Sequence, residues 1–228
     1  HTVIFIGPFS KGLENNSIKL LLNILDKKKL LTKKYKIKVT KNIPQKSGLG
    51  GGSMNAASIL SYFLREKIIN LSKKDLLSIC SKIGSDVSLG LEIKNSILKK
   101  NNSIRRFNIK LGLHALLVKP NRGCMTKKIY QEVKSFTKKR INLSKNLFSI
   151  ESLKNEQNDL EKPAFKIYPT LSKIKTYLSK IEQVKFVRMT GSGSTIVAYF
   201  TNKKAAINAL KLTNKNFKNY WSILSKTI

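Results

Sequence analysis

Residues 44–57 read PQKSGLGGGSMNAA, with four glycines among the five residues 48–52. Glycine permits positive φ and close approach of the backbone to a ligand, so several N–H groups can point at one anion. Ser53 is a favourable N-cap residue, and the apolar residues after it recur at helical spacing, so we predict a helix that starts there. The segment therefore indicates an anion-binding loop at a helix N-terminus rather than an ordinary flexible turn.

Strands and helices alternate on both sides of this loop. The apolar patterns predict strands at residues 3–6, 36–43, 114–119, 184–189 and 195–200. They predict further helices at residues 73–83, 160–165, 171–181 and 203–212, and helices that begin near Ser17 and Thr126. Residues 96–108 are predicted as strands and turns, and residues 144–158 as a polar stretch. This mixture indicates a mixed α and β protein, with a domain boundary near the strand predicted at residues 114–119.

One of the twelve acidic residues lies in a setting unlike the others. Most of the carboxylates belong to lysine-rich polar segments, whereas Asp86 follows the predicted helix stop at Gly84 and lies among small and apolar residues. A carboxylate held in such a setting can accept the proton of a hydroxyl group. Asp86 is therefore the candidate general base, with a helix cap or turn residue as the alternative.

A second glycine-rich loop joins the strands predicted at residues 184–189 and 195–200. It reads TGSGS at residues 190–194. By itself this pattern is typical of a tight hairpin turn. A loop that packs beside bound phosphates is the functional alternative.

The chain is strongly basic, with a net charge of +33 over 228 residues. A basic surface can bind nucleic acid by releasing counterions, but the lysines are spread along the whole sequence and no aromatic stacking motif accompanies them. We therefore expect no specific nucleic-acid partner, although the charge favours anionic nucleotides.

Composition also bears on location. The hydrophobic content of 41% supports a folded core, no segment is long and apolar enough to span a membrane, and the two cysteines form no metal-binding pattern. We expect no membrane partner, a monomer or weak homodimer, and a cytoplasmic location in a bacterium or one in a plastid-type organelle.

Three segments together resemble the signatures of the GHMP kinase superfamily, which includes galactokinase, homoserine kinase and mevalonate kinase. They are GLGGGSMNAA at residues 48–57, GSDV at residues 84–87 and RMTGSGS at residues 188–194. The triple glycine is most similar to the version in the diphosphocytidyl-methylerythritol kinases. The chain departs from that pattern at Lys46, Met54 and Ser88, where the family has a small residue, a serine and a proline. The family's first signature, with a lysine and a tyrosine-histidine pair, is expected upstream of His1.

The resemblance implies a two-domain α+β fold, with an N-terminal domain at residues 1–110 like domain 2 of ribosomal protein S5 and a ferredoxin-like C-terminal domain at residues 111–228. It implies transfer of the γ-phosphoryl group of ATP, with Mg²⁺, to the 2-hydroxyl of a small-molecule substrate, diphosphocytidyl methylerythritol. Asp86 would be the catalytic base and Ser53 a metal ligand. The residues expected at the nucleotide are Pro44, Gln45, Lys46, Ser47, Gly48, Leu49, Gly50, Gly51, Gly52, Ser53, Met54, Gly191, Ser192 and Gly193.

Three alternatives stay open at this point. A GHMP kinase with homoserine or mevalonate as acceptor is the first, because the acceptor pocket cannot be derived from these residues. The second is a protein that binds nucleotide without transferring phosphate. The third is a basic RNA-associated protein, which would bind RNA with steep salt dependence and would not turn over ATP.

Overall fold

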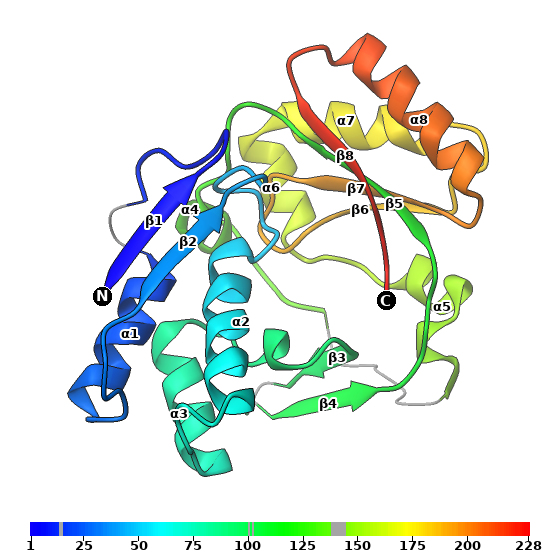
Figure 1. Cartoon of the computed structure of the whole chain (residues 1–228). Coiled ribbons are helices and arrows are strands. Elements are labelled where there is room, and N and C mark those ends of the chain that lie inside the picture. The colour runs from blue at the N-terminus through cyan, green and yellow to red at the C-terminus, as the bar shows by residue number, and fades with distance from the viewer. Residues whose placement is uncertain (14–15, 100, 102, 138–144) are drawn as a thin grey trace. The chain divides into compact units, whose positions relative to one another are not determined.

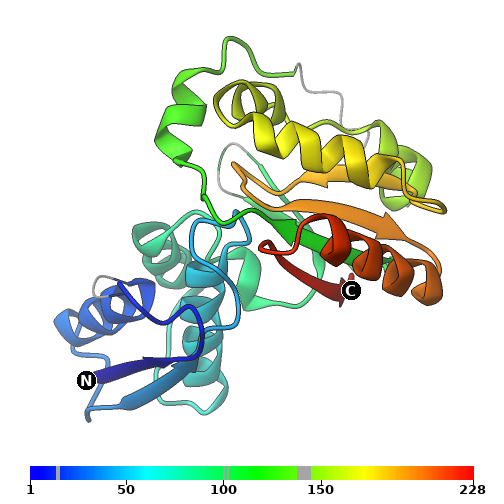
Figure 2. The ribbon, with the colours of Figure 1, turned by 90° about the horizontal axis from the view of Figure 1, so that it is seen from above.

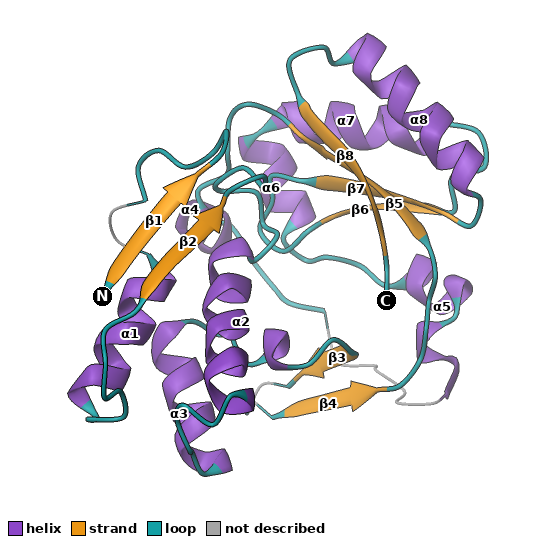
Figure 3. Cartoon of the chain, viewed as in Figure 1, coloured by secondary structure: helices purple, strands orange, loops and turns teal. Residues whose placement is uncertain are grey.

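The computed structural model describes residues 1–13, 16–99, 101, 103–137 and 145–228 (Figure 1). The chain forms two compact units, of residues 1–45 with 50–108 and of residues 46–49 with 109–228. Helices and strands occur in both units (Figure 3), so the α+β prediction is confirmed. The first half of the glycine-rich segment belongs to the second unit, a grouping that no contiguous division of the sequence predicts.

The first unit opens with a β-α-β arrangement. Strands β1 (Thr2–Ile6) and β2 (Lys36–Thr40) are parallel, and α1 (Ser17–Lys27) connects them, because parallel strands need a crossover connection. The Asn16 side chain caps α1 by accepting two backbone N–H groups. The strand predicted at residues 36–43 is β2, which ends at Thr40, three residues earlier than predicted.

Two longer helices, one short 3₁₀ helix and two paired strands follow in the first unit. They are α2 (Gly51–Arg65), α3 (Lys73–Ile83), the short 3₁₀ helix η1 (Leu89–Leu91), β3 (Asn95–Leu98) and β4 (Ile104–Phe107). Strands β3 and β4 pair antiparallel, as the prediction of strands and turns at residues 96–108 allows. The buried core of the unit comes from one face of each helix, with Leu22 of α1, Leu60 and Phe63 of α2, and Ile79 of α3.

The second unit contains a four-stranded antiparallel sheet. Its strands lie in the order β6 (Phe186–Met189), β7 (Ile196–Phe200), β5 (His114–Lys119) and β8 (Trp221–Lys226). The sequence pattern predicts β5, β6 and β7 but not β8. The β8 strand is half exposed and carries serine and lysine, so its apolar signal is weak.

Six helical segments accompany this sheet in the described part of the second unit. They are α4 (Thr126–Gln131), η2 (Lys145–Phe148), α5 (Ile150–Asn155), α6 (Glu161–Ile167), α7 (Pro169–Ser179) and α8 (Lys203–Asn216). The α7 helix packs on β6 and β7, and α8 packs on β5 and β8 (Figure 2). Both helices join one core with alternate residues of the strands, so they share a face of the sheet. The polar stretch predicted at residues 144–158 contains two short helical segments, η2 and α5, and Ser149 caps the second of them.

Two further features concern the cysteines and the membrane question. Cys80 and Cys124 are free and buried. Among the described residues, no helix is both long and apolar enough to cross a membrane.

Candidate active site

The glycine-rich segment enters α2 through Gly50, which is the N-cap residue and adopts a left-handed conformation with φ 64° and ψ 16°. The helix then begins at Gly51. The prediction that Ser53 is the N-cap is therefore wrong, because the left-handed glycine turns the chain into the helix before Ser53 is reached. Ser53 occupies the third helical position instead.

The first turn of α2 leaves backbone N–H groups available to a ligand. The first N–H groups of a helix have no acceptor within the helix. The N-cap residue of α2 is Gly50, which has no side chain that could accept from them. Gly52 is exposed at this turn. The helix dipole adds partial positive charge, so this end of α2 suits phosphate oxygens.

A lysine that the sequence analysis overlooked lies beside this turn. Lys41 follows β2, and its Nζ lies 3.6 Å from the position that a Cβ on Gly51 would occupy. Burial lowers the pKa of the Lys41 amine. The signal was present in the sequence, because strand alternation places Lys41 on the same face as Ile37 and Val39, which pack on the core.

Asp86 lies in the turn between α3 and η1 and is exposed. Its Oδ2 is 3.9 Å from the position of a Cβ on Gly50, and the Ser85 hydroxyl donates to its Oδ1 at 3.2 Å. Ser53 is close to the same turn, since its Oγ lies 3.4 Å from the position of a Cβ on Gly84. The structure thus brings Asp86, Gly50 and Ser53 together at the start of α2.

Three other residues expected at the nucleotide make contacts within the protein. Pro44 is buried, and the exposed Gln45 donates to the Lys11 carbonyl at 2.6 Å. The Met54 N–H donates to the Gly50 carbonyl at 2.9 Å, as in a regular helix. These contacts shape the two ends of the glycine-rich segment.

The first half of the segment packs against residues 190–195 inside the second unit. The buried Ser47 accepts at its carbonyl from the Thr195 N–H at 3.0 Å and from the Thr190 hydroxyl at 3.3 Å. The Lys46 carbonyl accepts from the Ser194 hydroxyl at 3.2 Å. A Cβ on Gly48 would lie 2.5 Å from the Thr190 carbonyl oxygen, so only glycine fits there. Leu49 completes this half and is partly buried.

The second glycine loop is itself supported by Asn158, which lies between α5 and α6, and by Thr126 at the start of α4. The Asn158 amide donates to the carbonyls of Gly191 at 2.7 Å and Met189 at 3.0 Å. The Ser192 hydroxyl pairs with that of Thr126 at 2.8 Å, and Gly193 has a positive φ of 82°. Many polar groups around this loop are therefore engaged within the protein.

A metal ion at this site would need ligands from the nucleotide or from water in addition to protein side chains. The described residues contain no group of three or more His, Cys, Asp or Glu side chains that could hold a metal ion. Mg²⁺ commonly binds through one or two protein oxygens together with substrate phosphates and water. The Ser53 hydroxyl, which lies beside the Asp86 turn, fits a Mg²⁺ site that is completed by substrate phosphates and water.

Two family models match the chain. The model of the GHMP kinases N terminal domain matches residues 16–92, and that of the GHMP kinases C terminal region matches residues 140–219. The resemblance inferred from the three glycine- and aspartate-containing segments is thereby confirmed.

Curated relatives agree with these models. A 4-diphosphocytidyl-2-C-methyl-D-erythritol kinase of Pelagibacter ubique is 51% identical over 100% of this chain and 82% of the relative. A kinase of the same name from Petrotoga mobilis is 34% identical over 83% of this chain and 77% of the relative. Both relatives are bacterial.

Solved structures confirm the fold. A crystal structure of 4-(cytidine 5'-diphospho)-2C-methyl-D-erythritol kinase matches with a TM-score of 0.74 at 21% identity, over 97% of this chain and 81% of the other. Homoserine kinase from Cytophaga hutchinsonii matches with a TM-score of 0.68 at 18% identity, over 99% of this chain and 82% of the other. The chain belongs to the GHMP kinases, which are ATP-dependent small-molecule kinases, and within them to the family of 4-diphosphocytidyl-2-C-methyl-D-erythritol kinases.

Proposed function

We propose that this chain transfers the γ-phosphoryl group of ATP to the 2-hydroxyl of 4-diphosphocytidyl-2-C-methyl-D-erythritol, a step toward isoprenoid precursors. The products are the 2-phosphate and ADP. The observation that carries the proposal is the Asp86 carboxylate, which lies beside the N-terminus of α2 in a chain 51% identical to a kinase of that name. The reaction takes place in the cytoplasm of a bacterium, in line with the bacterial relatives.

Asp86 acts as the general base in this proposal. Its Oδ2 takes the proton of the acceptor hydroxyl, the hydroxyl oxygen attacks the γ-phosphorus, and the bond from that phosphorus to the bridging oxygen of ADP breaks. The Ser85 hydroxyl donates to Oδ1. The other oxygen, Oδ2, is the one nearer to Gly50.

The start of α2 binds the phosphates of ATP. The N–H groups of Gly51, Gly52 and Ser53 donate to phosphate oxygens, and the helix dipole stabilises their negative charge. The Lys41 ammonium, which lies against Gly51, adds a full positive charge. Because phosphoryl transfer depends chiefly on position and charge stabilisation, these groups supply most of what the reaction needs.

Mg²⁺ would be held by the Ser53 hydroxyl together with oxygens of the nucleotide. When bound, the ion neutralises charge on the phosphates. The role of the chain is to place one hard oxygen ligand at the start of α2, close to the Asp86 turn.

Turnover by Asp86→Asn tests the proposal. ADP release and phosphorylated product are measured with 4-diphosphocytidyl-2-C-methyl-D-erythritol, homoserine and mevalonate as acceptors. We expect turnover with the first acceptor alone, and a fall of about 10³-fold in Asp86→Asn with ATP affinity within about twofold of wild type, because only the base is lost.

The control is Glu66→Gln, which removes an exposed carboxylate at the far end of α2 and is expected to leave turnover unchanged. Unchanged turnover in Asp86→Asn would remove Asp86 from its role. Turnover with homoserine or mevalonate would reassign the acceptor, and salt-dependent RNA binding without ADP release would favour an RNA-associated protein.

A further inference from the structure

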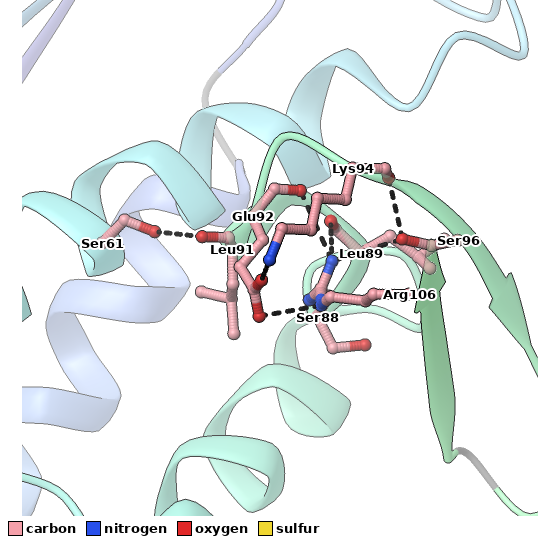
Figure 4. A network of polar contacts seen from close by, with 8 residues as sticks. All are labelled: Ser61, Ser88, Leu89, Leu91, Glu92, Lys94, Ser96 and Arg106. Carbon is pink, nitrogen blue, oxygen red and sulfur yellow. Dashed lines mark hydrogen bonds and ion pairs between the residues drawn. The ribbon is translucent and has the colours of Figure 1, made fainter. Parts of the chain in front are cut away.

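Arg106 of β4 makes a set of contacts to the segment that follows Asp86 (Figure 4). Its Nη2 donates to the Ser88 carbonyl at 2.8 Å, and its Nη1 donates to the Leu89 carbonyl at 3.2 Å and the Glu92 carbonyl at 3.4 Å. Its Nε pairs with the Glu92 carboxylate at 2.9 Å. One largely buried guanidinium group thus binds three main-chain carbonyls and one carboxylate of the same short segment.

Two of the residues that Arg106 binds, Ser88 and Leu89, close the turn around Asp86. The Leu89 N–H donates to the Asp86 carbonyl at 3.1 Å, and the Ser88 hydroxyl donates to the Ser85 carbonyl at 3.4 Å. A displacement of Ser88 or Leu89 would therefore move the Asp86 backbone.

The opposite side of this segment packs tightly on α2. A Cβ on Gly90 would lie 2.8 Å from the Ala57 Cβ and 2.8 Å from the Met54 Sδ, and the Ser61 hydroxyl donates to the Leu91 carbonyl at 3.5 Å (Figure 4). The segment is thus bound by Arg106 on one side and by α2 on the other. The N-terminus of the same helix carries Gly50, beside Asp86.

We propose that Arg106 is a positioning residue, which fixes the Asp86 carboxylate relative to the N-terminus of α2. This inference builds on the proposed role of Asp86 as the base. The fork of N–H donors on arginine reaches several carbonyls at once, whereas the ammonium group of lysine is a compact point charge. Lysine at this position would keep the charge but would not hold all three carbonyls.

Space beside Arg106 makes it suitable for substitution. A cavity of about 720 Å³ is lined by Arg106, Ser88 and Glu92 together with apolar residues of α2, α3 and η1. Because a shorter side chain leaves room for water there, Arg106→Lys and Arg106→Gln are expected to fold.

Steady-state kinetics provide the first test. In Arg106→Lys and Arg106→Gln we expect kcat to fall about thirtyfold while KM for ATP stays within about twofold, since the base moves and the phosphate site does not. Arg105→Gln is the matched control, because Arg105 is the exposed neighbour on β4 and should leave kcat unchanged. Unchanged kcat in Arg106→Lys, or equal losses in kcat and ATP affinity, would overturn the inference.

Backbone amide resonances of the unliganded chain separate this inference from the proposed function. We expect the resonances of Asp86, Val87 and Leu89 to shift in Arg106→Lys but not in Arg105→Lys. If wild type turns over none of the acceptors while these shifts occur, the proposed function fails and the structural part of the inference stands. If the resonances do not move, Arg106 does not position Asp86, whatever the acceptor.

Discussion

The two halves of the glycine-rich segment use glycine for different purposes. In the first half, the carbonyls of Lys46 and Ser47 accept hydrogen bonds from residues 190–195, and Gly48 allows a backbone approach that no side chain permits. In the second half, Gly50 is left-handed and Gly51 and Gly52 begin a helix whose first N–H groups lack a capping side chain among the described residues. The first half is closed by the protein, and the second half is open to an anion.

This difference shows why a glycine count alone does not locate a phosphate site. Both halves contain glycine, yet a substitution at Gly48 threatens packing and one near Gly51 threatens binding. In the open half, the Lys41 side chain lies against Gly51 and adds a positive charge to the partial charge of the helix N-terminus. The comparison therefore predicts that stability and nucleotide affinity can be altered separately.

Gly48→Ala should give the largest effect. Its φ of 73° is unfavourable for alanine, and the new Cβ would meet the carbonyl oxygens of Thr190 at 2.5 Å and Gly193 at 2.6 Å. We expect the free energy of unfolding to fall by about 3 kcal/mol, from the left-handed strain and the forced displacement of backbone. Urea denaturation monitored by circular dichroism measures the loss.

Gly112→Ala is the matched control for that variant. Gly112 belongs to the same unit and has a similar φ of 62°, but a Cβ there would meet no atom within 4 Å. We expect this control to lose only about 1 kcal/mol, from strain alone. Equal losses in the two variants would show that the first half is not closed as described.

Lys41→Gln should give a smaller effect, on binding rather than folding. We expect ATP affinity to fall about tenfold, because a charge-assisted contact to phosphate is lost. Lys38→Gln is the control, since Lys38 is exposed on β2 and removes the same charge from the chain. Isothermal titration calorimetry measures both, and equal losses would reduce Lys41 to one contributor to the general basic field.

The pH dependence of affinity sharpens this test. Burial lowers the pKa of the Lys41 amine, and the protonated form is the one that binds phosphate. Wild-type affinity should therefore begin to fall, as pH rises, at a lower pH than an ordinary lysine would cause. Lys41→Arg should abolish this fall because arginine stays protonated.

Much of the fold could be predicted because the signals are local. The alternation in β2, the helical spacing in α3 and the apolar run of β5 each lie within one short segment. The β8 strand could not be predicted, because its place depends on pairing with β5, more than a hundred residues earlier in the chain. The start of α2 was mispredicted at Ser53 because sequence preference for a serine cap does not anticipate a left-handed Gly50.

The candidate site was predictable in its parts but not in its assembly. Asp86 and the two glycine loops stand out in the sequence, whereas the bonds from Thr195 and Thr190 to Ser47 span more than 140 residues. Lys41 was obscured by the 45 basic residues of the chain, although its strand parity marks it as inward-facing. Arg106 carries no motif, and its role depends on contacts to carbonyls that no sequence pattern encodes.

The open N-terminus of α2 is expected to bind the phosphates of the nucleotide. Titration of the ¹⁵N-labelled chain with ADP and Mg²⁺, followed by amide ¹H–¹⁵N correlation spectra, measures this binding residue by residue. We expect the amide resonances of Gly51, Gly52 and Ser53 to shift strongly, while that of Thr195, already bonded to Ser47, shifts little. Saturable binding that leaves those three amides unmoved would contradict this expectation.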